Sequence, residues 1–284
     1  MPLLRVLKSR STLNQTRTLW HIEHMAWLIN AHGPIHLPRV PSVLQRFESL
    51  SQTAYRSDDA RTQEDWAEDL FGRVVTDCHM QDWDLKCREL PDDPDKGIAG
   101  VSVARTWHPK APGLYYVDVL GNPVVVSDPD NASCEGGMAL SYILQLATLR
   151  LISSNAPEHY DPYQHAMAVM GVAVYNGQGL ECLAMASRLT QHLLSSGRVK
   201  QSEINAFIGE LEFATVLAMK ARGLAPEQVV ASYGPILERS LRKRIWSIYQ
   251  ELEAFAPEVK LLQRLCSGFH DTEDSQAQLR SAVS

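Results

Sequence analysis

Four histidines fall within residues 21–36, at positions 21, 24, 32 and 36. Imidazole nitrogens bind zinc and transfer protons near neutral pH. His21 and His24 lie one helical turn apart, so both can reach a single ion. His32 lies roughly 12 Å beyond His24 on a helix that rises 1.5 Å per residue, which is too far to share that ion. The spacing therefore indicates His21 and His24 as candidate zinc ligands, with the Cys78-His79 pair as candidates for the remaining positions.

The same histidines have a second interpretation that needs no metal. At about 100° per residue, His21, His24 and Trp27 fall on one broad apolar arc of a helix expected over residues 12–32. Gly33-Pro34 ends that helix, as a C-terminal glycine followed by proline does. Imidazoles on an apolar face usually hydrogen-bond within or beside the core. We therefore expect no cofactor, with zinc at His21 and His24 as the alternative.

Cys134 is a candidate nucleophile because it lies at the expected start of a helix, in DNASCEGGMALSYIL. A helix N-terminus lowers the pKa of a thiol, and cysteine hydrolases pair the resulting thiolate with a histidine. His165 is the candidate partner. The Asp161-Pro162 pair, however, predicts a helix over 161–175, where a catalytic histidine of such a fold is not expected. A buried cysteine is the alternative role for Cys134.

A third candidate site is the basic segment ERSLRKRIW, which ends at Trp246. Cationic and aromatic side chains in one helix can contact phosphate, nucleic acid or an acidic partner. Leu241, Ile245, Ile248, Leu252 and Phe255 repeat at a spacing of four and three, which indicates an apolar seam on the opposite face. The alternative is therefore a solvated helix face over a buried seam. The candidate binding residues are Arg239, Arg242, Lys243, Arg244 and Trp246.

Composition excludes several classes of protein. The 284 residues are 45% hydrophobic and 21% charged, as in folded globular chains, and the net charge of −6 gives no overall attraction to nucleic acid. Five widely spaced cysteines without a CxxC indicate reduced thiols rather than a disulfide framework. The most apolar stretch, 138–152, is interrupted by polar residues and is shorter than the roughly 20 residues of a membrane helix.

The first 22 residues carry four basic residues and no acidic one. This composition fits a basic arm on a cytoplasmic protein. It also fits an organelle targeting segment, which would place the mature chain in an organelle matrix. We expect a cytoplasmic protein, with the organelle matrix as the alternative.

The hydrophobic period changes along the chain from helical to alternating and back. The fold class expected is α+β, mainly α, with a multi-helix domain and a small antiparallel β-sheet near the middle of the chain. Gly121-Asn122-Pro123 separates two valine-rich runs and predicts a β-hairpin. The expected regions are an N-terminal helical region over 1–80, a β element over 81–130, a C-terminal helical region over 131–270 and a flexible tail over 271–284. Helices are expected over 12–32, 43–55, 62–77, 133–153, 161–175, 180–195 and 202–221, with a short one from 226.

The chain contains no GxGxxG, GxxxxGK[ST], HExxH, GxSxG or EF-hand motif. The sequence therefore favours a non-enzymatic intracellular helical adaptor or assembly subunit that binds other macromolecules, with proteins as the expected partners. The alternatives are a cysteine hydrolase using Cys134 and His165, and a nucleic-acid-binding accessory protein using residues 239–246. The sequence does not predict the oligomeric state.

Overall fold

The computed structural model describes residues 15–36, 60–89, 101–104, 115–118, 122–127, 136–154, 162–195, 201–232, 237 and 239–268, apart from some side chains inside these elements. Most of these residues are helical. The helices are α1 (Gln15–His32), α3 (Ala60–Asp77), α5 (Gly137–Ser153), α6 (Pro162–Tyr175), α7 (Gly179–Ser195), α8 (Gln201–Ala221), α9 (Pro226–Ser232), α10 (Arg239–Glu251) and α11 (Ala256–Cys266), with a 3-10 turn η2 (Leu252–Phe255) before the last.

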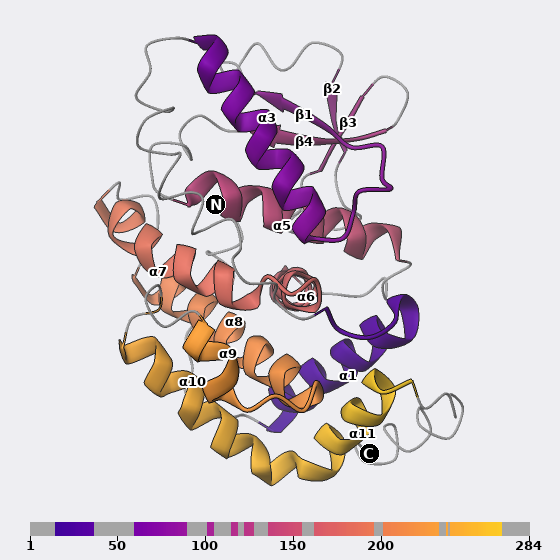
Figure 1. Ribbon diagram of the computed structural model, residues 1–284, viewed down its shortest axis with the longest axis vertical. Coiled ribbons are helices and arrows are strands. Elements are labelled where there is room, and N and C mark those ends of the chain that lie inside the picture. The colour runs from indigo at the N-terminus through magenta and orange to yellow at the C-terminus, as the bar shows by residue number, and fades with distance from the viewer. Residues whose placement is uncertain are drawn as a thin grey trace.

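Helix α6 lies in the middle of the molecule, where it is seen end-on (Figure 1). It packs against α1, α5, α7 and α8, and every side chain from His165 to Tyr175 is buried. Its sequence explains this position, because His165 is the only residue between 165 and 175 with a strongly polar side chain. Helices α1, α10 and α11 lie on one side of α6, and α5 separates it from the sheet on the other.

The four strands are β1 (Lys86–Glu89), β2 (Val101–Ala104), β3 (Tyr115–Asp118) and β4 (Pro123–Ser127), in the spatial order β1-β4-β3-β2. Strands β3 and β4 pair antiparallel, with Tyr116 opposite Val124, which confirms the predicted hairpin. The prediction of an antiparallel sheet was wrong, because β1 pairs with β4 in parallel. Alternating side chains identify a strand, but the direction of its neighbour depends on the path of the connecting chain.

Strand β4 is the buried centre of the sheet. Val124, Val125 and Val126 are all buried, and α5 packs against the strand. Gln145 of α5 accepts a hydrogen bond from the Val126 backbone N–H at 2.9 Å and donates one to its carbonyl at 2.8 Å. The Gln145 amide thus satisfies the backbone N–H and carbonyl of Val126, as a neighbouring strand would. It also joins α5 to the sheet.

The predicted helices agree closely with α1, α3, α5, α6, α7, α8 and α9. The expected helix over 43–55 lies outside the described residues. The sequence did not predict helix α11, because Pro257 interrupts the apolar pattern and a proline usually ends a helix. In the structure Pro257 is in the first turn of α11, where its missing N–H removes no hydrogen bond. The last two residues of the predicted seam, Leu252 and Phe255, lie in the 3-10 turn between α10 and α11.

One cluster of buried hydrophobic side chains includes Ile22, Val125 and Leu252, and so draws on each of the three main expected regions. No helix in the described part of the chain is both long and apolar enough to cross a membrane.

Helix α6 carries a glycine where the His24 side chain of α1 packs against it. A Cβ on Gly171 would lie 2.7 Å from Cδ2 of His24, which is closer than real side chains come. We expect Gly171→Ala to lower the free energy of unfolding by about 1–3 kcal/mol, because the helices must separate. Urea denaturation measures the change.

The matched control is Gly209→Ala in α8, where a Cβ meets nothing within 4 Å. Alanine has the higher helix propensity, so this variant is expected to gain up to about 1 kcal/mol. Equal effects of the two substitutions would show that the contact with His24 does not limit the packing.

Candidate functional site

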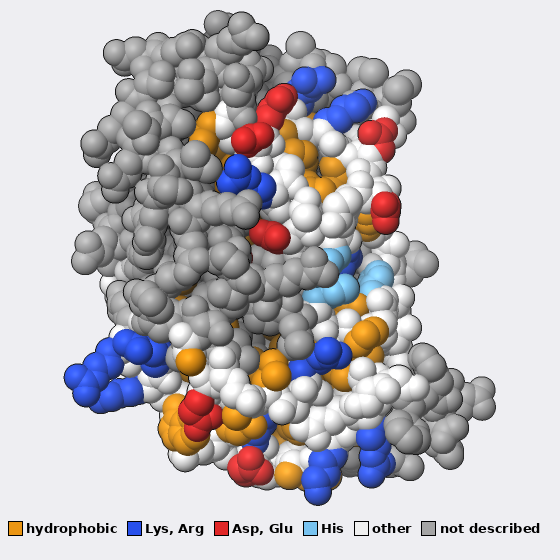
Figure 2. Space-filling model, viewed as in Figure 1, with side chains coloured by type: hydrophobic (Ala, Val, Ile, Leu, Met, Phe, Trp, Pro, Cys, Tyr) orange, Lys and Arg blue, Asp and Glu red, His pale blue; other side chains and the backbone are white. Residues whose placement is uncertain are grey.

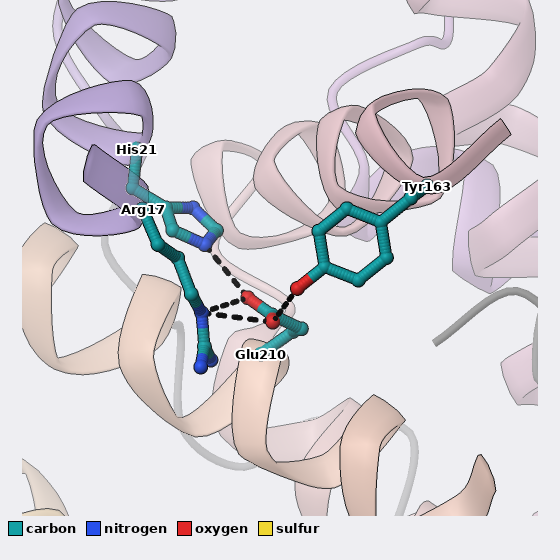
Figure 3. A network of polar contacts seen from close by, with 4 residues as sticks. All are labelled: Arg17, His21, Tyr163 and Glu210. Atoms are coloured by element: carbon teal, nitrogen blue, oxygen red, sulfur yellow. Dashed lines mark hydrogen bonds and ion pairs between the residues drawn. The ribbon is translucent and has the colours of Figure 1, made fainter. Parts of the chain in front are cut away.

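A cluster of four polar side chains lies where α1, α6 and α8 meet. Glu210 of α8 is 3% exposed and receives hydrogen bonds from three side chains (Figure 3). Arg17 Nε lies 2.8 Å from both carboxylate oxygens, and His21 Nε2 lies 2.9 Å from Oε2. The Tyr163 hydroxyl donates to Oε1 at 2.6 Å. The carboxylate is thus surrounded by donors from two other helices.

The charges in this cluster balance. Burial raises the pKa of the Glu210 carboxyl, but the hydrogen bonds and charges of His21, Arg17 and Tyr163 outweigh it and leave the pKa below its ordinary value. Burial lowers the pKa of His21 by more than Glu210 raises it. His21 is therefore a neutral imidazole that donates its Nε2 proton, and Arg17 supplies the single positive charge that matches Glu210.

His24 is held in a different way. Its ring lies between Trp20 and Trp27, with centroids 5.0 and 5.5 Å away. Nε2 donates to the carbonyl of Ala168 in α6 at 3.2 Å. Burial lowers the pKa of His24 to about 3, so this ring is also neutral. His24 therefore acts as a hydrogen-bonded part of the packing between α1 and α6.

These contacts of His21 and His24 agree with the interpretation in which both imidazoles form hydrogen bonds in the core. Among the described residues, no group of three or more His, Cys, Asp or Glu side chains is arranged to hold a metal ion. His79, expected as a further ligand, stacks on His36 with ring centroids 3.8 Å apart. Burial raises the pKa of the Cys78 thiol far above its ordinary value, which disfavours the thiolate that binds zinc. Zinc at His21 and His24 remains a prediction without a described third ligand.

Arg150 of α5 forms a second buried polar centre that sequence analysis missed. Its guanidinium donates to Asn176 Oδ1 at 2.6 Å and to the carbonyls of Cys78 and His79 at 3.2 and 2.8 Å. It therefore holds the chain after α3 against the end of α6. The available signal was an arginine within the most apolar stretch of the sequence, where an unpaired charge is costly.

Histidines also group on the surface near the middle of one face (Figure 2). The described histidines with exposed area are His32, His36 and His79. His32 Nε2 lies 2.7 Å from the Ser154 hydroxyl. The backbone N–H of His36 donates to the Tyr175 carbonyl at 3.0 Å. These contacts join the end of α1 and the segment after it to the ends of α5 and α6.

One member of the expected cysteine–histidine pair, His165, belongs to the described residues. Cys134 lies outside the described residues. His165 is buried in the first half of α6, which is a helix as the Asp-Pro pair predicted. The pairing of Cys134 with His165 stays an untested prediction.

Helix α10 presents the predicted basic residues to solvent. Arg239, Arg242 and Lys243 are exposed, while Leu241 and Ile245 on the other side are buried. Arg244 differs from its neighbours because it donates to Glu212 at 2.7 Å and neutralises this buried carboxylate. Trp246 is 41% exposed, the one large hydrophobic side chain with high exposure among those described.

Comparison with known proteins gives no further assignment. No family model matches the sequence, and no curated protein or solved structure matches the chain.

The Glu210 cluster predicts the effect of removing its negative charge. Glu210→Gln leaves the Arg17 charge unmatched and turns one acceptor into a donor, so we expect a loss of about 1–3 kcal/mol in the free energy of unfolding. The control is Asp69→Asn, which removes a carboxylate from an exposed pair with Arg73 at 3.7 Å. That variant is expected to change stability by less than about 0.5 kcal/mol. Equal losses in urea denaturation would contradict the role given to Glu210.

The buried histidines predict a pH dependence. The pKa values of His21 and His24 are lowered by folding, so below pH 6.5 the unfolded chain binds protons that the folded chain does not. The free energy of unfolding should therefore decrease as the pH is lowered below 6.5, by up to about 1.4 kcal/mol per pH unit for each such histidine. For His24 this loss continues towards its folded pKa of about 3. Denaturation of His24→Gln between pH 7.5 and 5 should show a shallower slope than wild type. A flat wild-type profile would exclude buried neutral histidines.

Proposed function

We propose that this protein is a non-enzymatic, cytoplasmic helical adaptor that binds an acidic segment of a partner protein through the exposed face of α10. The observation that carries the proposal is the grouping of three exposed cations around the exposed Trp246. The described cysteines, Cys78, Cys87, Cys182 and Cys266, are free thiols, which fits a reducing compartment. An organelle matrix is the alternative compartment.

The proposed docking face consists of Arg239, Arg242, Lys243 and Trp246. At about 100° per residue these four side chains fall within an arc of about 100° with Trp246 near its centre. The buried residues Leu241 and Ile245 fall on the opposite side. An aromatic side chain surrounded by cations is typical of the anchor residues that dominate protein interfaces.

The apolar seam of α10 does not contribute to this face. Leu241, Ile245 and Leu252 are buried in the core, and Ile248 and Phe255 are half-buried. The seam therefore fixes α10 to the rest of the fold, mainly against α8. Since the seam is used internally, the exposed basic face remains available to a partner, and docking does not require the fold to open.

Charge favours a protein partner over nucleic acid. Only three cations of α10 are without an ion pair among the described contacts, because Arg244 is bound to Glu212. A protein that holds nucleic acid through its phosphates uses many cations, and the net charge of −6 adds no overall attraction to a polyanion. An acidic segment with an apolar residue for Trp246 can match both the cations and the ring.

The experiment is affinity purification of the full chain from native extract, followed by mass spectrometry, with three variants. Trp246→Ala and the double variant Arg242→Glu/Lys243→Glu are expected to lose the same co-purifying proteins. The control Arg73→Glu changes a partly exposed arginine of α3, which the chain places outside the docking face, and should keep them. A tenfold or greater loss on the docking-face variants corresponds to removing one interface anchor.

Two outcomes oppose the proposal. Co-purifying proteins that persist in both docking-face variants would place the interface elsewhere. Recovery of nucleic acid, with retention that falls steeply between about 50 and 200 mM salt and vanishes in the double variant, would favour the nucleic-acid alternative.

A further inference from the structure

A second aromatic ring lies beside the exposed Trp246 on α10. The ring of Tyr249 is nearly parallel to the indole, with ring centroids 6.4 Å apart and an angle of 10° between the planes. Tyr249 is half-buried, so part of its surface is open to solvent. At about 100° per residue, Tyr249 falls about 60° from Trp246, on the side where Arg242 also falls. The two rings and the cations of the docking face therefore form one continuous strip.

Lys220 of α8 fixes the position of Tyr249. Its Nζ lies 4.4 Å from the centroid of the Tyr249 ring, a distance typical of a cation–π contact. Lys220 is 6% exposed, and Glu253 matches its charge at 2.5 Å. Lys220 therefore adds no free cation to the docking face, but it orders the ring. A side chain that is already ordered loses less conformational entropy when a partner binds to it.

The strip has its charges at one end and its rings at the other. The centre of the three cations precedes the centre of the two rings by about six residues, or roughly 9 Å along the helix axis. An extended chain rises about 3.1–3.4 Å per residue, so it covers this distance in about three residues. A helical partner would instead present an apolar stripe over several turns. The apolar part of this strip consists of two rings one turn apart, which fits an extended segment better.

We propose that the docking face binds an extended acidic segment in which a residue with a ring, phenylalanine or proline, follows or precedes an acidic pair by three residues. The carboxylates lie on the three cations, and the partner's ring packs on Trp246 and Tyr249. This inference rests on the proposed function and adds Tyr249 as a second aromatic anchor. Aromatic and proline rings both pack on the faces of Trp and Tyr rings. The ring distinguishes such a segment from other acidic chains.

The test is fluorescence anisotropy of labelled synthetic peptides with the full chain. The reference peptide has two adjacent glutamates, two serines and then phenylalanine, in a glycine–serine background. Comparison peptides replace phenylalanine with proline or with glycine, replace both glutamates with glutamine, or insert three further serines before the ring. We expect saturable binding of the phenylalanine peptide, the proline peptide or both. The glycine, glutamine and long-spacer peptides should bind at least about fivefold more weakly.

Two variants connect the ring of the peptide to Tyr249. Tyr249→Ala is expected to weaken the ring peptide by about fivefold or more, and the matched control Tyr249→Phe should bind as wild type because the ring remains. In Tyr249→Ala, replacing the ring of the peptide with glycine should weaken binding by about threefold or less, because the contact is already lost. Circular dichroism shows whether Tyr249→Ala is folded. If it is not, the peptide series on the wild-type chain decides.

The outcomes separate this inference from the proposed function. If no glutamate peptide binds, or if Arg242→Glu/Lys243→Glu leaves the affinity unchanged, both are overturned. If glutamate peptides bind and the charge reversal abolishes binding, the proposed function stands. This inference is then overturned if the glycine or the long-spacer peptide binds as tightly as the ring peptides. Equal effects of the ring-to-glycine change in wild type and in folded Tyr249→Ala would also overturn it.

Discussion

Helix α6 is buried from His165 to Tyr175, and its neighbours must therefore supply a continuous apolar cover on every side. Helices α1, α5, α7 and α8 provide that cover. Their own polar side chains then meet each other inside the protein, where water cannot satisfy them. Glu210 with Arg17, His21 and Tyr163 is one such meeting point, and Arg150 with Asn176 is another. These networks follow from the burial of α6 and determine how the surrounding helices are oriented.

The same constraint explains how two histidines are accommodated in the core. A neutral imidazole can donate to a carboxylate, as His21 does, or to a main-chain carbonyl, as His24 does, without bringing a charge into the core. Burial lowers both pKa values and keeps the rings neutral. This arrangement makes the fold sensitive to acid, because at low pH the unfolded chain binds protons that the native chain does not bind.

The proposed docking face lies where α10 packs on α8. On α10 the buried seam uses one face of the helix, and Arg244 binds Glu212, which leaves three cations around Trp246. The core thus satisfies its own requirements and leaves positive charge at a defined position on the surface. An anionic group of a partner is therefore what the proposed face requires.

The sequence by itself determined most helices, the hairpin formed by β3 and β4, and the basic face of α10. These features depend on periodicity, on Gly and Pro at helix ends, and on charges on one side of a helix, all of which are local. Only the tertiary structure decided that β1 pairs in parallel with β4, that Pro257 starts a helix, and that Glu210 is the partner of His21. Glu210 and His21 are 189 residues apart. No local pattern specifies such a pair, because it is selected by which helices cover α6 and by the need to neutralise each buried charge.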